Sequence, residues 1–478
     1  MKKEDLNEEE NENQNLIENN QENNPEIIQK EQEDNNLQDQ PRETKVSIQI
    51  HESPDITDVD EDYQEKCYSM KEGKTLTAVL PNGLRIIQTA SPTDVVYCGY
   101  AVNAGTRDEL PSEHGLAHFV EHTLFKGTRK RSAWHILNRM ENVGGDLNAF
   151  TNKEETVVYA SCLRKDFRRA VELLSDIVFN STFPQKEIAG ELGVILDEIE
   201  SYEDSPSELI FDDFEDILFA GHPLGHNILG TPGLLKTFTS QSAQSFTARH
   251  YFPANAVLFV HGNIPFGRVL RYAEQYTDGL PSGTAGTNRR PPVPLPASRV
   301  VRRKRTHQTH VLMGCEAYPA DDPRRTGLYL LNNLLGGPGM NSRLNVALRE
   351  HLGLVYNVES NLTGYTDTGV FNIYFGSSPA DAPRCVELTL SELKRLRDTP
   401  LSSLQLHAAK KQLIGQLGVA ADNFENNALA MGKTFLHYNR FQHTAALFAR
   451  IEALSAAALQ DIAREIFAEE HLTTLIYE

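Results

Sequence analysis

Short strand-like runs and longer helical segments follow one another along the chain, and their order is similar in two parts of it. The strand-like runs are rich in Val, Tyr, Phe and Thr, residues that suit a pleated, half-buried surface. In the first part, strands are predicted at 95–102, 146–151 and 156–162, with a helix at 167–178. In the second part, strands are predicted at 309–314, 355–360 and 368–375, with helices at 325–335 and 382–397. Strands with helices laid on one face indicate an α+β fold, here with two related halves.

Residues 278–298 separate the two parts. This stretch is rich in Gly and Pro and has no core pattern, so an extended linker is predicted. Its proline run at 291–296 also resembles a ligand for a proline-binding module, but a spacer is the favoured interpretation. The predicted domains are therefore 67–277 and 299–478.

Residues 1–66 differ from the rest of the chain. They contain 21 acidic and six basic residues, and so carry −15 of the formal net charge of −20. Isolated apolar residues in such a segment cannot bury enough surface to offset the entropy of ordering. A disordered acidic tail is predicted, with a role as a solubilising tail favoured over a regulatory one. The segment lacks the apolar core of a signal peptide and the arginine-rich, acid-poor composition of a transit peptide.

The charge and cysteine content of the remainder narrow the function classes. Without the tail the net charge is only −5, which favours neither nucleic acid nor an anionic membrane as a partner. No apolar run approaches the 18 or so residues that a membrane-spanning helix needs. The cysteines are odd in number and show no C-x-x-C spacing, which indicates reduced, buried thiols and a cytoplasmic protein. They are Cys67, Cys98, Cys162, Cys315 and Cys385.

The candidate metal-binding and catalytic motif is His118-Phe-Val-Glu-His122. Two histidines four residues apart lie on one face of a helix, close enough for both imidazoles to bind one metal ion. Glu121 sits beside them, where a carboxylate can reach a water on that ion. This is the H-x-x-E-H pattern of the inverzincin peptidases. Two unrelated surface histidines, or histidines hydrogen-bonded in a core, are the alternatives.

A third metal ligand is expected on a later helix at 187–202. On a helical wheel, four apolar residues form its buried stripe, and Glu191 and Glu198 fall together at the margin of that stripe. The four are Ile188, Leu192, Ile195 and Ile199. A half-buried carboxylate needs a positive partner. A surface salt bridge is one explanation for both glutamates, but the two unpaired imidazoles favour metal binding by Glu198.

Because of this motif and the two later glutamates, the segment from about 76 to 262 resembles the catalytic half of the M16 metallopeptidases. This family includes insulinase, pitrilysin and mitochondrial processing peptidase. That family places its third ligand some seventy residues after the second histidine, and Glu198 is 76 residues after His122. Glu191 matches a supporting glutamate one heptad earlier. Further family-like stretches lie at 105–109, 144–151, 155–156, 222–225 and 229–231.

The resemblance implies two homologous αβ rolls, of which the second is non-catalytic, and one zinc ion per chain. In the second half, Arg349 and Tyr356 match residues that family members extend toward the scissile carbonyl, where both could donate hydrogen bonds to an oxyanion. A surface ion pair with Glu350 is the alternative for Arg349, and core packing is the alternative for Tyr356. The glycine-rich stretch 336–343 lacks the ending of a phosphate loop, so a turn is expected there.

The expected reaction is hydrolysis of unfolded peptides by a zinc-activated water, with Glu121 as general base. The strand at 146–151 is expected to bind the peptide by edge-to-edge pairing, with Asn148 and Ala149 near the cut. A homodimer, or a heterodimer with an inactive paralogue, is also expected, because long family members have four rolls. A non-catalytic scaffold subunit and a plain zinc-binding module are the alternatives.

Overall fold

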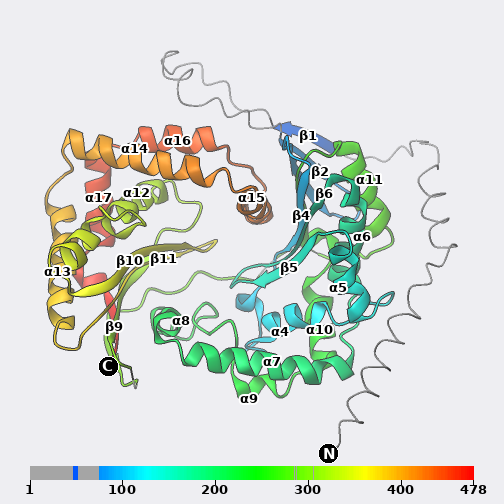
Figure 1. The fold of residues 1–478 in the computed structure, drawn as a ribbon, viewed down its shortest axis with the longest axis horizontal. Coiled ribbons are helices and arrows are strands. Elements are labelled where there is room, and N and C mark those ends of the chain that lie inside the picture. The colour runs from blue at the N-terminus through cyan, green and yellow to red at the C-terminus, as the bar shows by residue number, and fades with distance from the viewer. Residues whose placement is uncertain (1–46, 52–74, 285, 287, 305) are drawn as a thin grey trace, which may run out of the picture. The chain divides into compact units, whose positions relative to one another are not determined.

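A computed structural model describes residues 47–51, 75–284, 286, 288–304 and 306–478, the first five by their backbone only. The described chain contains two β-sheets (Figure 1). The first sheet has the order β1-β2-β3-β7-β4-β6-β5, and the second has the order β10-β11-β9-β12-β8. The strands of the first sheet are β1 (Ser47–His51), β2 (Thr75–Val79), β3 (Arg85–Thr89), β4 (Val95–Val102), β5 (Asp146–Thr151), β6 (Thr156–Leu163) and β7 (Ala256–His261). Those of the second are β8 (Arg299–Arg302), β9 (Thr309–Ala317), β10 (Val355–Gly364), β11 (Gly369–Ser377) and β12 (Thr473–Tyr477).

Helices of the first half form a layer on one face of the first sheet and join it in one hydrophobic core. Buried side chains of β4, such as Val96 and Tyr100, pack there with Phe119 and Leu174. The helices of this layer are α4 (Leu116–Leu124), α5 (Ala133–Glu141), α6 (Phe167–Asn180), α7 (Gln185–Glu203), α9 (Pro232–Leu235), α10 (Ser240–His250) and α11 (Phe266–Thr277).

The second sheet has its own core with the helices of the second half. Phe371 and Phe375 of β11 lie among buried side chains that include Leu331 and Leu459. The helices that contribute to this core are α12 (Arg325–Gly336), α13 (Ala382–Asp398), α14 (Ser403–Ala420), α16 (Thr444–Glu452) and α17 (Ala456–Ile466). The strands and helices predicted from the sequence are all present, several of them one to four residues longer than predicted. The α+β fold is confirmed.

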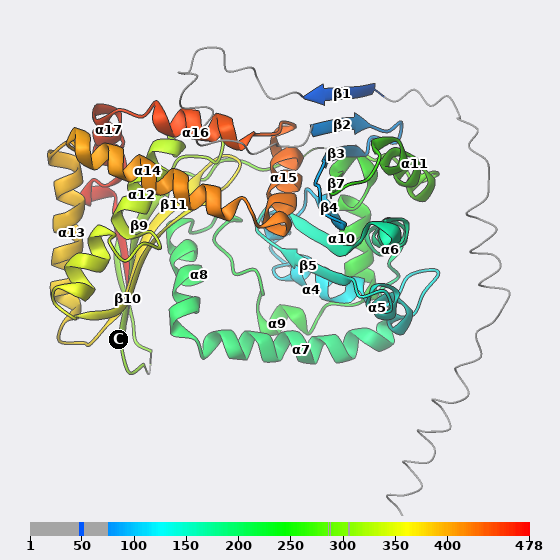
Figure 2. The same ribbon diagram turned by 45° about the horizontal axis from the view of Figure 1, so that its top comes forward.

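Two helices pack on the sheet of the opposite half, which the sequence pattern did not predict (Figure 2). Helix α8 (Pro206–Leu218) comes from the first half, but its Ile210 and Phe214 pack with Leu312 and Leu475 of the second sheet. Helix α15 (Phe424–Tyr438) comes from the second half and covers the free face of the first sheet. Each sheet is therefore covered on both faces, and the two halves share two hydrophobic clusters.

The linker is attached to the first half. Between Thr277 and Arg299 none of the described residues lies in a helix or strand. The Arg289 guanidinium donates to the Asp108 carboxylate at 2.6 Å and to the Glu154 carbonyl at 2.6 Å. A spacer role alone does not predict these buried contacts.

One sequence-based expectation is wrong for five residues. Residues 47–51, inside the segment expected to be a disordered tail, form β1 and pair with β2 in antiparallel register. Their sequence, Ser-Ile-Gln-Ile-His, alternates apolar and polar residues as strands do.

Residues 1–46 and 52–74, and with them Cys67, lie outside the described part. The other four cysteines are buried free thiols, and no described helix has both the length and the apolarity to cross a membrane.

Candidate metal centre

Helix α4 carries the H-x-x-E-H motif and presents both histidines on one side. It begins after Gly115, whose φ of +94° lies in the left-handed region that favours glycine. The apolar side chains of Phe119 and Val120 are completely buried against the sheet. This packing turns His118 and His122 toward α7, with their ring centroids 4.6 Å apart.

Helix α7 brings Glu198 to the two histidines. Its Oε2 atom lies 3.3 Å from His122 Nε2 and 3.7 Å from His118 Nε2. Ligand atoms about 2.0–2.1 Å from a tetrahedral zinc lie roughly 3.3–3.4 Å apart, so the spacing fits one ion. Among the described residues these three form the one cluster of His, Cys, Asp and Glu side chains with such spacing, with all its ligand atoms within 4.8 Å.

The donor set has the chemistry that a catalytic zinc site needs. Two imidazoles and one carboxylate leave a fourth position open, as in other two-histidine, one-glutamate sites. Burial, with a smaller contribution from the neighbouring His122, lowers the pKa of His118 to about 3. His118 is therefore neutral at physiological pH, which is the state that binds a metal.

Glu121 lies on α4 between the metal centre and the end of β5. Burial raises the pKa of its carboxyl group, while a hydrogen bond from the Thr151 hydroxyl and the charge of His122 oppose this effect. A raised pKa makes a carboxylate a better proton acceptor than an ordinary one, which suits a general base. Thr151 is the last residue of β5, so the same contact ties Glu121 to that strand.

Glu191 stands behind His122. One carboxylate oxygen lies 3.3 Å from His122 Nδ1, and the other forms an ion pair with Lys126. Glu191 therefore orients the imidazole from the side opposite to Glu198, as carboxylates commonly do for metal-binding histidines. The sequence indicated Glu191 but gave no reason to single out Lys126 or Thr151.

Among the described strands, β5 is the last of the first sheet and pairs with β6 alone. Its outer edge therefore has backbone groups free for another strand. Asn148 is exposed and Ala149 is half-buried on this strand. Both lie three or fewer residues from Thr151, and so close in sequence to the contact with Glu121.

Comparison with known proteins gives the family of this chain. Residues 85–232 match the family described as insulinase (peptidase family M16), and residues 237–413 match the peptidase M16 inactive domain. An uncharacterized zinc protease of Bacillus subtilis is 31% identical over 396 residues, which is 83% of this chain and 96% of that protein. The chain belongs to peptidase family M16. Mitochondrial-processing peptidase subunit beta of Bos taurus is 32% identical over 81% of each chain.

Solved structures show that the M16 fold extends over both halves. A peptidase M16 inactive domain from Pseudomonas fluorescens superposes with a TM-score of 0.79, at 20% identity, over 84% of this chain and 97% of that one. A protease from Helicobacter pylori superposes with a TM-score of 0.77, at 21% identity, over 85% of this chain and all of that one. These two likenesses establish the fold alone.

Two residues suggested by the M16 resemblance lie in the second half. Arg349 belongs to η5 (Asn345–Glu350), a π-helical stretch, and its closest acidic partner is Glu350 at 3.8 Å. Tyr356, near the start of β10, is 84% exposed, which rules out core packing. Both line a cavity of about 450 Å³ together with Ser207 of α8. Neither forms a hydrogen bond or ion pair with the three clustered residues in the described part of the chain.

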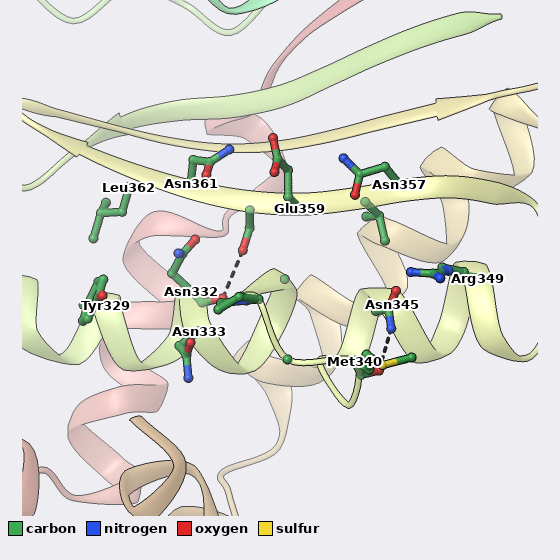
Figure 3. Close-up of a pocket in the computed structure, with 16 residues that line it drawn as sticks. Tyr329, Asn332, Asn333, Met340, Asn345, Arg349, Asn357, Glu359, Asn361 and Leu362 are labelled. Carbon is green, nitrogen blue, oxygen red and sulfur yellow. Dashed lines mark hydrogen bonds between the residues drawn. The ribbon is translucent and has the colours of Figure 1, made fainter. Parts of the chain in front are cut away.

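Arg349 also lines a second cavity of about 450 Å³, between α12 and β10 (Figure 3). Its walls are rich in asparagine and include the glycine-rich stretch that follows α12. Asn332 extends from α12 toward β10, and its backbone carbonyl accepts a hydrogen bond from Ser360 at 3.0 Å. The stretch connects α12 to η5, as expected for a turn between helices.

Proposed function

We propose that this protein is a zinc-dependent endopeptidase that cleaves unfolded peptides. The observation that carries the proposal is the convergence of His118, His122 and Glu198, with Glu121 beside them and the free edge of β5 next to Glu121. A purely structural zinc site is usually closed by a fourth protein ligand, which this cluster lacks among the described residues. Relatives named zinc proteases, and the processing peptidase subunit, support the same conclusion.

His118, His122 and Glu198 would hold the zinc ion, one per chain. When bound, zinc supplies a Lewis acid that polarises the scissile carbonyl and acidifies water. Glu121 accepts the proton of the attacking water and then donates it to the leaving amine. Glu191 keeps His122 oriented through both steps.

The substrate is proposed to bind as an added strand on the edge of β5, through backbone hydrogen bonds near Asn148 and Ala149. Such binding requires an extended backbone and therefore selects unfolded peptides. Tyr356 and Arg349 are proposed to donate hydrogen bonds to the oxyanion of the tetrahedral intermediate. The exposure of Tyr356 leaves its hydroxyl available for this role.

Metal analysis combined with a peptide-cleavage assay tests this proposal. The purified protein is expected to contain about one zinc per chain and to cleave an unstructured peptide. His118→Ala and Glu198→Gln should each lose most of the zinc and all measurable cleavage, because each removes one of three ligands. Glu203→Gln, an exposed glutamate on the same helix, is the matched control and should change neither. Full zinc occupancy in both ligand variants would contradict the proposed site, and a zinc-loaded wild type that cleaves nothing would favour a scaffold role.

The partner is a further part of the proposal. With two rolls in this chain and four in the long family members, a closed chamber would need a second chain, either another copy or an inactive M16 paralogue. The free cysteines support a reducing, cytoplasmic setting. Light scattering on the purified protein distinguishes a homodimer from a monomer, and a monomer is the result expected of a chain that needs a different partner.

A further inference from the structure

The carboxylate of Glu109 is completely buried beside the first turn of α4. Its Oε1 accepts a hydrogen bond from the Ala117 N–H at 2.7 Å, and its Oε2 accepts one from the Gly115 N–H at 2.9 Å. The first N–H groups of a helix have no partner within the helix, and a negative group there is favourable. Gly115 has no side chain to serve as a cap. Glu109, from outside the helix, therefore caps the helix that carries both histidines.

His226 holds this carboxylate from the other side. Its Nε2 lies 2.9 Å from Glu109 Oε2, and its ring stacks on that of His114 with centroids 3.8 Å apart. The ammonium group of the buried Lys153 donates to the backbone carbonyl of His226. The cap is thus itself fixed by a loop that is distant in the sequence.

Two glycines let that loop approach the start of α4. Gly115 and Gly230 have φ values of +94° and +71°, which side chains rarely adopt. A Cβ atom on Gly230 would lie 2.3 Å from the carbonyl oxygen of His114, and one on Gly115 would lie 2.8 Å from that of Leu229. The backbone of the loop around Gly230 therefore packs directly on the backbone at the start of α4, and the first turn of this helix has little room to shift.

The two metal-facing histidines are held in different ways. His122 has a partner for its second ring nitrogen, the Glu191 carboxylate at 3.3 Å. The corresponding atom of His118, Nδ1, is buried and has no hydrogen-bond partner among the described residues. Histidine ligands usually gain their orientation from such a second hydrogen bond. His118 directly follows Ala117, whose N–H is bound to Glu109, so its orientation depends on the backbone of the first turn.

We propose that Glu109 and His226 are positioning residues for the metal centre, and that they fix the first turn of α4 so that His118 points its Nε2 toward Glu198. The proposal rests on the proposed zinc function. It also gives a role to two of the family-like stretches, 105–109, which contains Glu109, and 229–231, which contains Gly230.

Zinc affinity of the Glu109→Gln variant tests this role. A glutamine keeps one acceptor oxygen and so satisfies only one of the two backbone N–H groups. The matched control is Glu113→Gln, because the Glu113 carboxylate pairs with Arg249 at 2.7 Å and does not cap α4. Zinc affinity is measured by chelator competition, and ligand geometry by the visible spectrum of the cobalt-substituted protein. Circular dichroism and thermal unfolding of the metal-free proteins report the fold separately.

Glu109→Gln is expected to bind zinc about 10–100-fold more weakly and to alter the cobalt spectrum, while the metal-free protein stays folded. Glu113→Gln should match the wild type in both measurements. A folded Glu109→Gln protein with wild-type affinity and spectrum would overturn the proposal. If that variant does not fold, His226→Phe, which keeps the stacked ring and removes Nε2, is judged by the same outcomes. A wild type that binds no zinc would contradict the proposed function too, whereas unchanged affinity in the variant contradicts only the positioning role.

Discussion

The orientation of individual side chains decides whether His118, His122 and Glu198 can bind the same zinc ion. Glu191 is the clearest case, because it is half-buried between a ring nitrogen of His122 and the ammonium group of Lys126. Removing its charge leaves Lys126 without its partner and the His122 ring without its second contact. A half-buried charged group that loses its partner is destabilising, and a metal ligand without its supporting hydrogen bond is less well oriented.

Glu191→Gln is therefore expected to weaken zinc binding by about 10–100-fold and to lower cleavage by a similar factor. The fold should be retained, since the substitution keeps the shape of the side chain. Glu200→Gln, an exposed glutamate on the same helix, is the control and should behave as the wild type. Equal zinc affinity in Glu191→Gln and the control would show that Glu191 has no part in the site.

At the scale of elements, helix α7 follows its sequence pattern closely. Ile188, Ile195 and Ile199 are buried, and Glu191 and Glu198 are half-buried at the margin of that stripe. Periodicity predicts such faces because neighbours along one helix determine them. The spacing of the motif also indicated which side chains would converge.

The packing of α8 and α15 on the sheet of the opposite half could not be predicted from the sequence pattern. Both are amphipathic helices, and their patterns predict a buried face without showing which sheet covers it. The same limit applies to the contact of Glu109 with α4, and to Lys126, because each joins groups through the tertiary fold. Tyr356 is the reverse case. Its aromatic ring suggested core packing as an alternative, but it lies at the start of the edge strand β10, where the pairing register shifts, and is exposed.

Helix α15 should contribute strongly to stability. Phe435 is buried against the first sheet, and α15 approaches so closely that a Cβ on Gly432 would lie 2.5 Å from Phe259. Phe435→Ala is expected to lower the free energy of unfolding by about 3–5 kcal/mol in urea titrations. Leu404→Ala, at a residue that is 78% exposed, should change it by less than about 0.5 kcal/mol. Equal effects of the two substitutions would show that α15 is not docked as described.

At the scale of the whole molecule, a buried ionic network joins the two halves next to the linker. Arg107 pairs with Glu154 at 2.7 Å and with Asp367 of the second half at 2.6 Å. Glu154 also accepts hydrogen bonds from the backbone and hydroxyl groups of Thr366 in the second half. Together with α8 and α15, these contacts hold the second half against the first half, as the proposed role for Tyr356 in catalysis requires.

The measurement that tests the central claim most directly is the zinc content and peptide-cleavage rate of Glu121→Gln, taken on one preparation. The substitution removes the general base and leaves His118, His122 and Glu198 in place. The account predicts about one zinc per chain, as in the wild type, and a cleavage rate lower by at least about 10²–10⁴-fold. A zinc-loaded Glu121→Gln protein that cleaves peptide at a rate close to that of the wild type would contradict it.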